Sequence, residues 1–119
     1  MGTKAIIAAA LLATAGTAAA APIATTYLCN DGTFIHLSEL NGRLNLSWRG
    51  ENYPISQIET QTDGARLMGG TPGSTAVDFT APWLTGYTTT TTTIDVSKVD
   101  AAAVSQDCRP DHRSKRLDI

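Results

Sequence analysis

Histidine and cysteine are scarce in this chain of 119 residues, and their scarcity excludes much of the usual chemistry of active sites. The histidines are His36 and His112, and the cysteines are Cys29 and Cys108. So few side chains cannot assemble a metal cluster of recognisable spacing. A serine nucleophile would need a neighbouring base, and the sequence has no Gly-x-Ser-x-Gly elbow. We therefore expect no enzyme, no metal site, no cofactor and no small-molecule substrate.

Basic residues are few between residues 22 and 108, where four stand against nine acidic residues and give a net charge of −5. The basic residues are Arg43, Arg49, Arg66 and Lys98, and the acidic residues are Asp31, Glu39, Glu51, Glu59, Asp63, Asp78, Asp95, Asp100 and Asp107. An acidic surface disfavours binding to nucleic acid and to anionic membranes, and it favours a basic partner. Solubility is the competing explanation, because many exported bacterial proteins are acidic.

Long apolar runs are missing except at the start of the chain. An apolar run at residues 5–15 is followed by three alanines at 18–20. This pattern is typical of a secretory signal peptide, which we expect over residues 1–20 with cleavage after Ala20. The run is shorter than the roughly 20 residues that span a bilayer. The residues before Cys29 lack the small pair of a lipoprotein signal, so we expect no membrane anchor and a periplasmic or secreted bacterial protein.

The two cysteines bracket nearly all of the strand-like sequence. In an exported chain an even pair of cysteines predicts a disulfide, here between Cys29 and Cys108. Closing a loop of about 80 residues restricts the unfolded chain by about 4–5 kcal/mol in the loop-entropy model. That free energy is comparable to the whole stability of a small domain.

Turn signals divide residues 22–108 into short β-prone segments. Strands are expected at 25–28, 33–37, 43–48, 53–58, 65–68, 75–80 and 87–96. Asn41-Gly42 is the strongest hairpin signal, and the strict alternation that follows it predicts a half-buried strand. Pro54 cannot donate to a ladder, so its strand lies at an edge or carries a bulge. Apart from a possible turn near residues 99–105, no helix pattern follows the signal peptide, and the pattern indicates an all-β barrel or sandwich.

The chain changes character after Cys108. Residues 109–119 are rich in basic side chains and have little to bury, so a disordered basic tail is expected there. Such a tail could bind cell-wall phosphates or could have no function, and the sequence favours the second interpretation.

A polar cluster lies at the middle of the expected domain. Asp63-Gly64 between two strand-like runs predicts a tight turn, because glycine accepts the positive φ that such turns require. This turn would lift Thr62, Asp63, Ala65 and Arg66 to a loop tip, where binding groups are often presented, and Gly64 would allow another surface to approach closely. The alternative is an ordinary polar hairpin with solvated charges.

Four short motifs occur in order between residues 27 and 108. They are Tyr-Leu-Cys-Asn-Asp-Gly at 27–32, Asp-Gly-Ala-Arg-Leu at 63–67, Trp-Leu-Thr-Gly at 83–86, and Cys108. In order and rough spacing they resemble the membrane-bound/periplasmic inhibitor family of C-type lysozyme, whose motifs are Tyr-x-Cys-x-x-Gly, Ser-Gly-Ala-Arg/Lys-Tyr, Phe-Trp-x-Lys-Gly and a closing cysteine. The resemblance implies a small antiparallel β-barrel, closed by the disulfide, that plugs the lysozyme cleft with its loops.

The resemblance also implies which residues meet lysozyme. The implied binding loop consists of Thr62, Asp63, Gly64, Ala65, Arg66 and Thr85. Asp63 stands where the family has the serine that meets the catalytic carboxylates, and Thr85 stands where it has the lysine that supplies a counter-charge. Leu67 and Pro82 replace the family's tyrosine and phenylalanine. The contact residues therefore match the family less well than the framework does.

Two functions follow from these observations. C-type lysozymes are strongly basic, so the acidic domain would be steered toward them in a salt-dependent way. Asp63 would repel an ionised carboxylate in a dry contact, and it would need a protonated acid or a basic side chain opposite it. The second function is a non-inhibitory structural or interaction β-module of the bacterial envelope, which the missing lysine favours.

Overall fold

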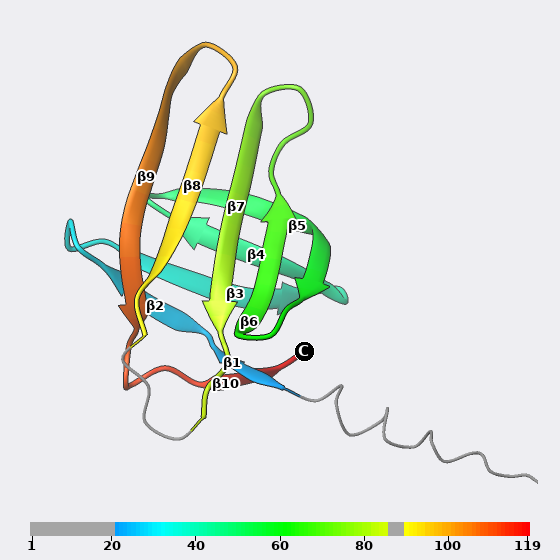
Figure 1. The fold of residues 1–119 in the computed structure, drawn as a ribbon. Helices are drawn as coiled ribbons and strands as arrows, with labels where there is room; N and C mark the ends of the chain where they lie inside the picture. Colours follow the sequence, from blue (N-terminus) through cyan, green and yellow to red (C-terminus); the bar gives the residue numbers. More distant parts are fainter. Residues whose placement is uncertain (1–20, 86–89) are drawn as a thin grey trace, which may run out of the picture.

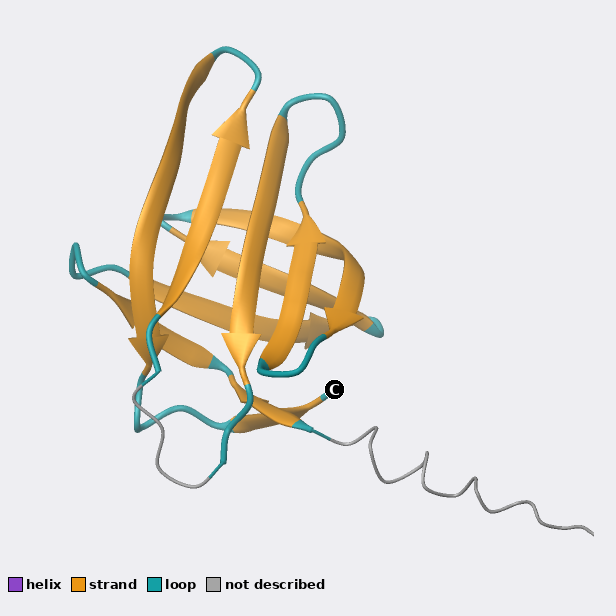
Figure 2. Cartoon of the chain, viewed as in Figure 1, coloured by secondary structure: helices purple, strands orange, loops and turns teal. Residues whose placement is uncertain are grey.

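The computed structural model describes residues 21–85 and 90–119, and their secondary structure is entirely β (Figures 1 and 2). The strands are β1 (Pro22–Ala24), β2 (Thr26–Cys29), β3 (Phe34–Leu40), β4 (Arg43–Trp48), β5 (Glu51–Thr60), β6 (Gly64–Gly69), β7 (Thr75–Pro82), β8 (Thr92–Lys98), β9 (Ala101–Pro110) and β10 (Arg116–Asp118). The expected signal peptide at 1–20 and part of the strand expected at 87–96 lie outside the described residues. Within the described residues, no helix has the length and apolar character needed to cross a membrane.

Strands β2 to β9 form a closed antiparallel barrel in sequence order, and β2 pairs with β9 to complete it (Figure 1). Cys29 and Cys108 are direct partners across this closing pair, and they form the expected disulfide over a separation of 79 residues. The expected fold class, a small antiparallel β-barrel closed by one disulfide, is confirmed. The disulfide joins the first and last strands of the barrel. It therefore stabilises the β2–β9 pairing, which has the largest sequence separation and so the largest entropic cost of loop closure.

The barrel interior is filled by alternating side chains of successive strands. Leu44, Leu46 and Trp48 of β4 all point inward, as the period of two predicts. Within this core, the fully buried rings of Tyr27 and Phe79 meet edge to face with their centroids 4.9 Å apart. Aromatic pairs prefer this geometry, which brings the positive edge of one ring to the negative face of the other.

Pro54 lies within the ten residues of β5, in a barrel where β5 has a neighbour on both sides. The pairing of β5 with β6 shifts register between Ile55 and Gln57, so the bulge interpretation is the correct one. Gly69 of β6 passes close to this bulge, and a Cβ there would come within 2.1 Å of the Pro54 carbonyl oxygen. Only glycine at position 69 allows β6 to pass this close to the Pro54 carbonyl.

The expectation of a disordered tail at 109–119 is wrong. Arg109 and Pro110 complete β9, and β10 pairs antiparallel with β1 so that Leu117 faces Ile23. Leu117 and Ile119 are partly buried and pack against the core. The alternation of Leu117 and Ile119 indicates a strand, but the many basic residues around them suggested a disordered tail. Burial of these two side chains offsets the conformational entropy lost when the segment is ordered.

Strand β9 was also missed in part, because at most a turn was expected near residues 99–105. Ala101, Ala102 and Ala103 have low β-propensity, yet they begin a strand of ten residues. Pairing with β8 provides their hydrogen bonds, with Ala101 opposite Lys98. Barrel closure therefore overrides local propensity here.

Candidate functional site

The turn between β5 and β6 has Thr62 and Asp63 at its centre. The Gln61 N–H donates to the Gly64 carbonyl oxygen at 2.8 Å, which closes a two-residue hairpin loop. Thr62 and Asp63 are both exposed. The sequence predicted a turn centred on Asp63 and Gly64. Gly64 instead belongs to β6 and its φ is not positive, so the turn centre lies one residue earlier, at Thr62 and Asp63.

Gly64 is required by packing within the barrel. A Cβ at this position would come within 2.3 Å of the Ala81 carbonyl oxygen on β7. The surface that approaches Gly64 closely is thus the protein's own strand. Ala65 is fully buried, with 0% exposure, and belongs to the core. Neither residue lies at the loop tip, and neither offers a side chain to a partner.

Arg66 lies on the outer wall of the barrel and is not at the loop tip either. Its guanidinium donates to both carboxylate oxygens of Asp78, with distances of 3.0 Å from Nε and 2.7 Å from an Nη. Glu59 on β5 adds a weaker ion pair at 4.0 Å. The hydrogen bonds to Asp78 and its negative charge raise the pKa of Arg66 above its ordinary value. The side chain therefore links three neighbouring strands of the barrel wall.

The segment after β7 lies beside the turn. The backbone N–H of Trp83 donates to the Asp63 carbonyl oxygen at 3.1 Å, and its indole N–H donates to the Gln61 carbonyl oxygen at 3.1 Å. Thr85 follows two residues later and is exposed. The structure thus brings Thr62 and Asp63 close to the end of β7, which leads to Thr85. Thr62, Asp63 and Thr85 are the exposed members of the expected loop.

Strands β1 and β10 extend this region across one end of the barrel (Figure 1). Ile23 of β1 forms a bridge with Trp83, and the Leu84 N–H donates to the Pro22 carbonyl oxygen at 2.9 Å. On its other side β1 pairs with β10. We call the turn 61–63, the segment 83–85, β1 and β10 together the barrel-end surface.

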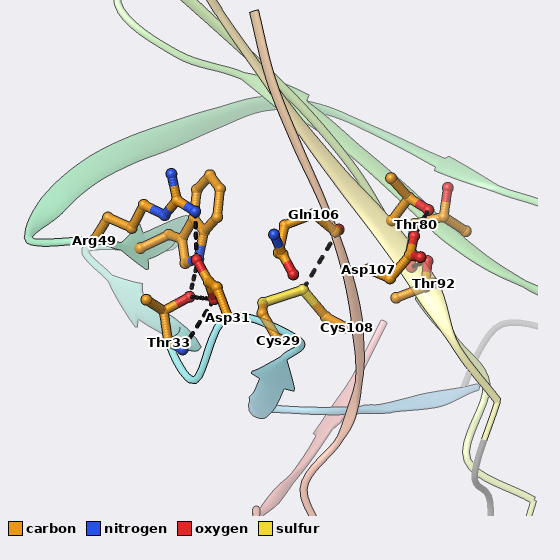
Figure 3. The surroundings of a disulfide bond; sticks show 11 residues. Cys29, Asp31, Thr33, Arg49, Thr80, Thr92, Gln106, Asp107 and Cys108 are labelled. Atoms are coloured by element: carbon orange, nitrogen blue, oxygen red, sulfur yellow. Dashed lines mark hydrogen bonds and ion pairs between the residues drawn. A yellow bond between two sulfur atoms is a disulfide. The ribbon is translucent and has the colours of Figure 1, made fainter.

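A second polar cluster lies near the disulfide, and the sequence reasoning missed it (Figure 3). Asp31 accepts a hydrogen bond of 2.6 Å from the Thr33 hydroxyl and forms an ion pair with Arg49. The Thr33 hydroxyl oxygen accepts from the Trp48 indole N–H at 2.8 Å, and the Arg49 guanidinium lies over the Trp48 ring at 4.3 Å. The Thr33 hydrogen bond and then Arg49 lower the pKa of Asp31 to about 2. This network ties two turns of the barrel together, and the spacing Asp31-x-Thr33 was the available signal.

A groove of about 550 Å³ lies at the other end of β6 and β7, beside the loop that joins them. It is lined by that loop and by outward residues of β7 and β8, including Asp78, Asp95 and Ser97. None of the residues expected to bind lysozyme lines it. Within 21–85 and 90–119, no group of three histidine, cysteine or acidic side chains is placed to hold a metal ion.

Comparison of the chain with protein-family models, with curated proteins and with solved structures gives no match.

Proposed function

We propose that this protein binds C-type lysozyme through its barrel-end surface and obstructs the lysozyme cleft without catalysis. The turn at Thr62 and Asp63 enters the cleft, and Thr85 lies beside it. The disulfide-closed barrel holds these groups on strand ends, so that little ordering is needed when the partner binds.

One observation carries the proposal. The two hydrogen bonds from Trp83 to the carbonyl oxygens of Gln61 and Asp63 join the two central motifs of the resemblance at one end of the barrel. The motifs are well separated in the sequence, and barrel pairing brings them together: Gly64 is opposite Pro82 in the β6–β7 ladder. A binding surface composed of both motifs needs this arrangement.

Asp63 sets the chemistry of the contact. It is exposed and makes no salt bridge among the described residues. The lysozyme general acid is kept protonated by its apolar pocket, so it can donate a hydrogen bond to the Asp63 carboxylate. Binding then weakens as the pH rises through the titration of that acid, because the shared proton is lost and two carboxylates repel.

The remaining motif residues support the fold. Gly64, Ala65 and Arg66 match the family, yet their contacts are with β5 and β7 of this chain. This observation favours the second candidate function, a non-inhibitory β-module of the bacterial envelope that keeps the framework residues and lacks the contact residues. The two candidates differ in whether lysozyme is bound at all.

Lysis of bacterial cell walls by a C-type lysozyme, followed by turbidity, separates the two functions. We expect the purified protein to slow lysis, and the variant Asp63→Trp to lose this effect because a bulky side chain blocks entry of the turn. Asp100→Trp is the matched control, since it removes the same charge from an exposed turn after β8. Unimpeded lysis with the wild-type protein would support the envelope module. Slowed lysis with both variants would show that another surface binds.

A further inference from the structure

Strand β10 and the residue before it carry two exposed cations on the barrel-end surface. The Lys115 backbone is held by three hydrogen bonds with Thr25. The Thr25 N–H and hydroxyl donate to the Lys115 carbonyl oxygen at 3.0 and 3.2 Å, and the Lys115 N–H donates to the Thr25 hydroxyl oxygen at 3.0 Å. Arg116 is the register partner of Ala24 in β1. The backbone of both residues is therefore held in place, while both side chains are exposed.

Neither charge has an ion-pair partner in the described part of the chain, and the nearest acidic residue along the strand is the exposed Asp118, two residues from Arg116 on the same face of β10. Lys115 and Arg116 form no salt bridge among the described residues, whereas the neighbouring Arg113 lies 3.4 Å from the Asp111 carboxylate. Two positive charges on an acidic protein thus point to solvent. Leu117 and Ile119, which pack against the core, anchor the strand that carries them.

These cations belong to the same surface as the turn at 61–63. Trp83, Ile23 and Leu117 form a continuous row across the segment 83–85, β1 and β10, and Arg116 is one residue away from this row. Neighbouring strands lie about 4.8 Å apart, so β10 lies about 10 Å from the segment 83–85. Thr85 lies two residues from the row of Trp83, in the direction of Ile119, whereas Arg116 and Lys115 lie one and two residues from the row in the opposite direction. A partner that covers the whole barrel-end surface can therefore contact Thr85 and both long, flexible cationic side chains.

We propose that Lys115 and Arg116 supply the positive charge that Thr85 lacks, by pairing with acidic groups in or beside the lysozyme cleft. This inference rests on the proposed function. It assigns a contact role to the segment that the sequence predicted to be disordered. It also explains how an acidic binding turn can be accommodated near carboxylates, since the same surface carries opposite charge a short distance away.

The sign of a charge effect distinguishes this contact from general electrostatics. Residues 21–119 contain eight basic and eleven acidic residues, a net charge of −3. Removing two cations makes the protein more acidic and strengthens its long-range attraction to a basic lysozyme. A local contact with cleft acids has the opposite consequence, because removing the cations leaves those acids without partners.

Calorimetric titration of a C-type lysozyme with the double variant Lys115→Gln/Arg116→Gln tests the inference. We expect binding about tenfold weaker than wild type or more, as for loss of a close charge pair. The control Arg43→Gln/Lys98→Gln removes two cations from other parts of the barrel, and we expect its affinity to be equal to wild type or higher. Adding Thr85→Lys to the first variant should restore binding. Lys115→Gln/Arg116→Gln should keep the wild-type unfolding midpoint, because both side chains are exposed and form no salt bridge among the described residues. The control also loses the exposed Lys98–Glu51 ion pair at 3.0 Å, so we expect its midpoint to be equal to wild type or slightly lower.

Equal or tighter binding by Lys115→Gln/Arg116→Gln would overturn the inference and leave the proposed function intact. Loss of affinity in both double variants alike would overturn it too, since the effect would then not be local. If the wild-type protein binds no lysozyme, the proposed function fails, and the inference fails with it.

Discussion

The indole N–H of Trp83 donates to the carbonyl oxygen of Gln61 at 3.1 Å, across 22 positions of the sequence. The bond connects the end of β7 to the turn between β5 and β6. It holds the turn from the side, so the position of Asp63 depends on a residue of another hairpin.

Replacing Trp83 by Phe should loosen this turn. The aromatic packing is kept and one hydrogen bond is lost, so we expect a destabilisation of about 1 kcal/mol and faster amide exchange at residues 62–64. Trp48→Phe is the matched control, because it removes an indole bond to Thr33 in another region. Equal exchange at the turn in the two variants would show that Trp83 does not hold it.

Leu117→Asp should detach β10 from the end of the barrel. Leu117 faces the fully buried Ile23 of β1. A carboxylate at position 117 would remove the apolar contact with Ile23 and expose the Ile23 side chain to water. We expect a loss of about 2 kcal/mol in the free energy of unfolding, which corresponds to a midpoint roughly 8 °C lower or more. The exposed neighbour Asp118→Ala should change the midpoint little. An unchanged midpoint for Leu117→Asp would mean that the segment contributes nothing to stability.

Gly64→Ala should destabilise the fold even without a partner present. The new Cβ meets backbone atoms of Ala81 and Pro82, which cannot move aside as the tip of a flexible side chain can. Overpacking of this kind costs about 1–3 kcal/mol, measurable by denaturant unfolding. Thr62→Ala at the exposed turn is the control and should cost little. If Gly64→Ala unfolds like wild type and loses only lysozyme binding, the glycine serves a partner and not the barrel.

The Asp31 network should make stability depend on pH in the acid range. The Thr33 hydrogen bond and Arg49 lower the pKa of Asp31 from the ordinary 3.8 to about 2, so the folded state favours the ionised carboxyl. This stabilisation is fully present above about pH 4 and is lost as the pH falls through about 2. Asp31→Asn should therefore be less stable than wild type at about pH 6 and approach it at about pH 2. A constant difference across this range, or an Asp31 pKa near its usual value by NMR, would contradict the network.

The local framework of the barrel could be predicted from the sequence. Asn41-Gly42 forms the expected turn with Asn41 at φ 53° and Gly42 at φ 78°, and the inward positions of the following strand agree with its alternation. The disulfide followed from the number of cysteines and from the signal peptide expected at 1–20. These features depend on neighbouring residues or on simple chemistry, which a sequence displays directly.

The site was less predictable, because it depends on pairing between distant strands. Arg66 appeared to be a loop cation, and only the register of β6 and β7 brings it to Asp78. Arg116 appeared to lie in a disordered tail, and only the pairing with β1 places it on the barrel-end surface. The burial of Ala65 likewise follows from the β6–β7 ladder, where it faces Ala81.

Calorimetric titration of a C-type lysozyme with wild-type protein and with Thr85→Lys tests the central proposal most directly. We expect saturable binding of one protein to one lysozyme. Thr85→Lys should bind more tightly by about 1–3 kcal/mol, because its ammonium group reaches the cleft carboxylates beside the Asp63 turn. Absence of binding heat at several temperatures for both proteins would contradict the proposal that the barrel-end surface binds lysozyme.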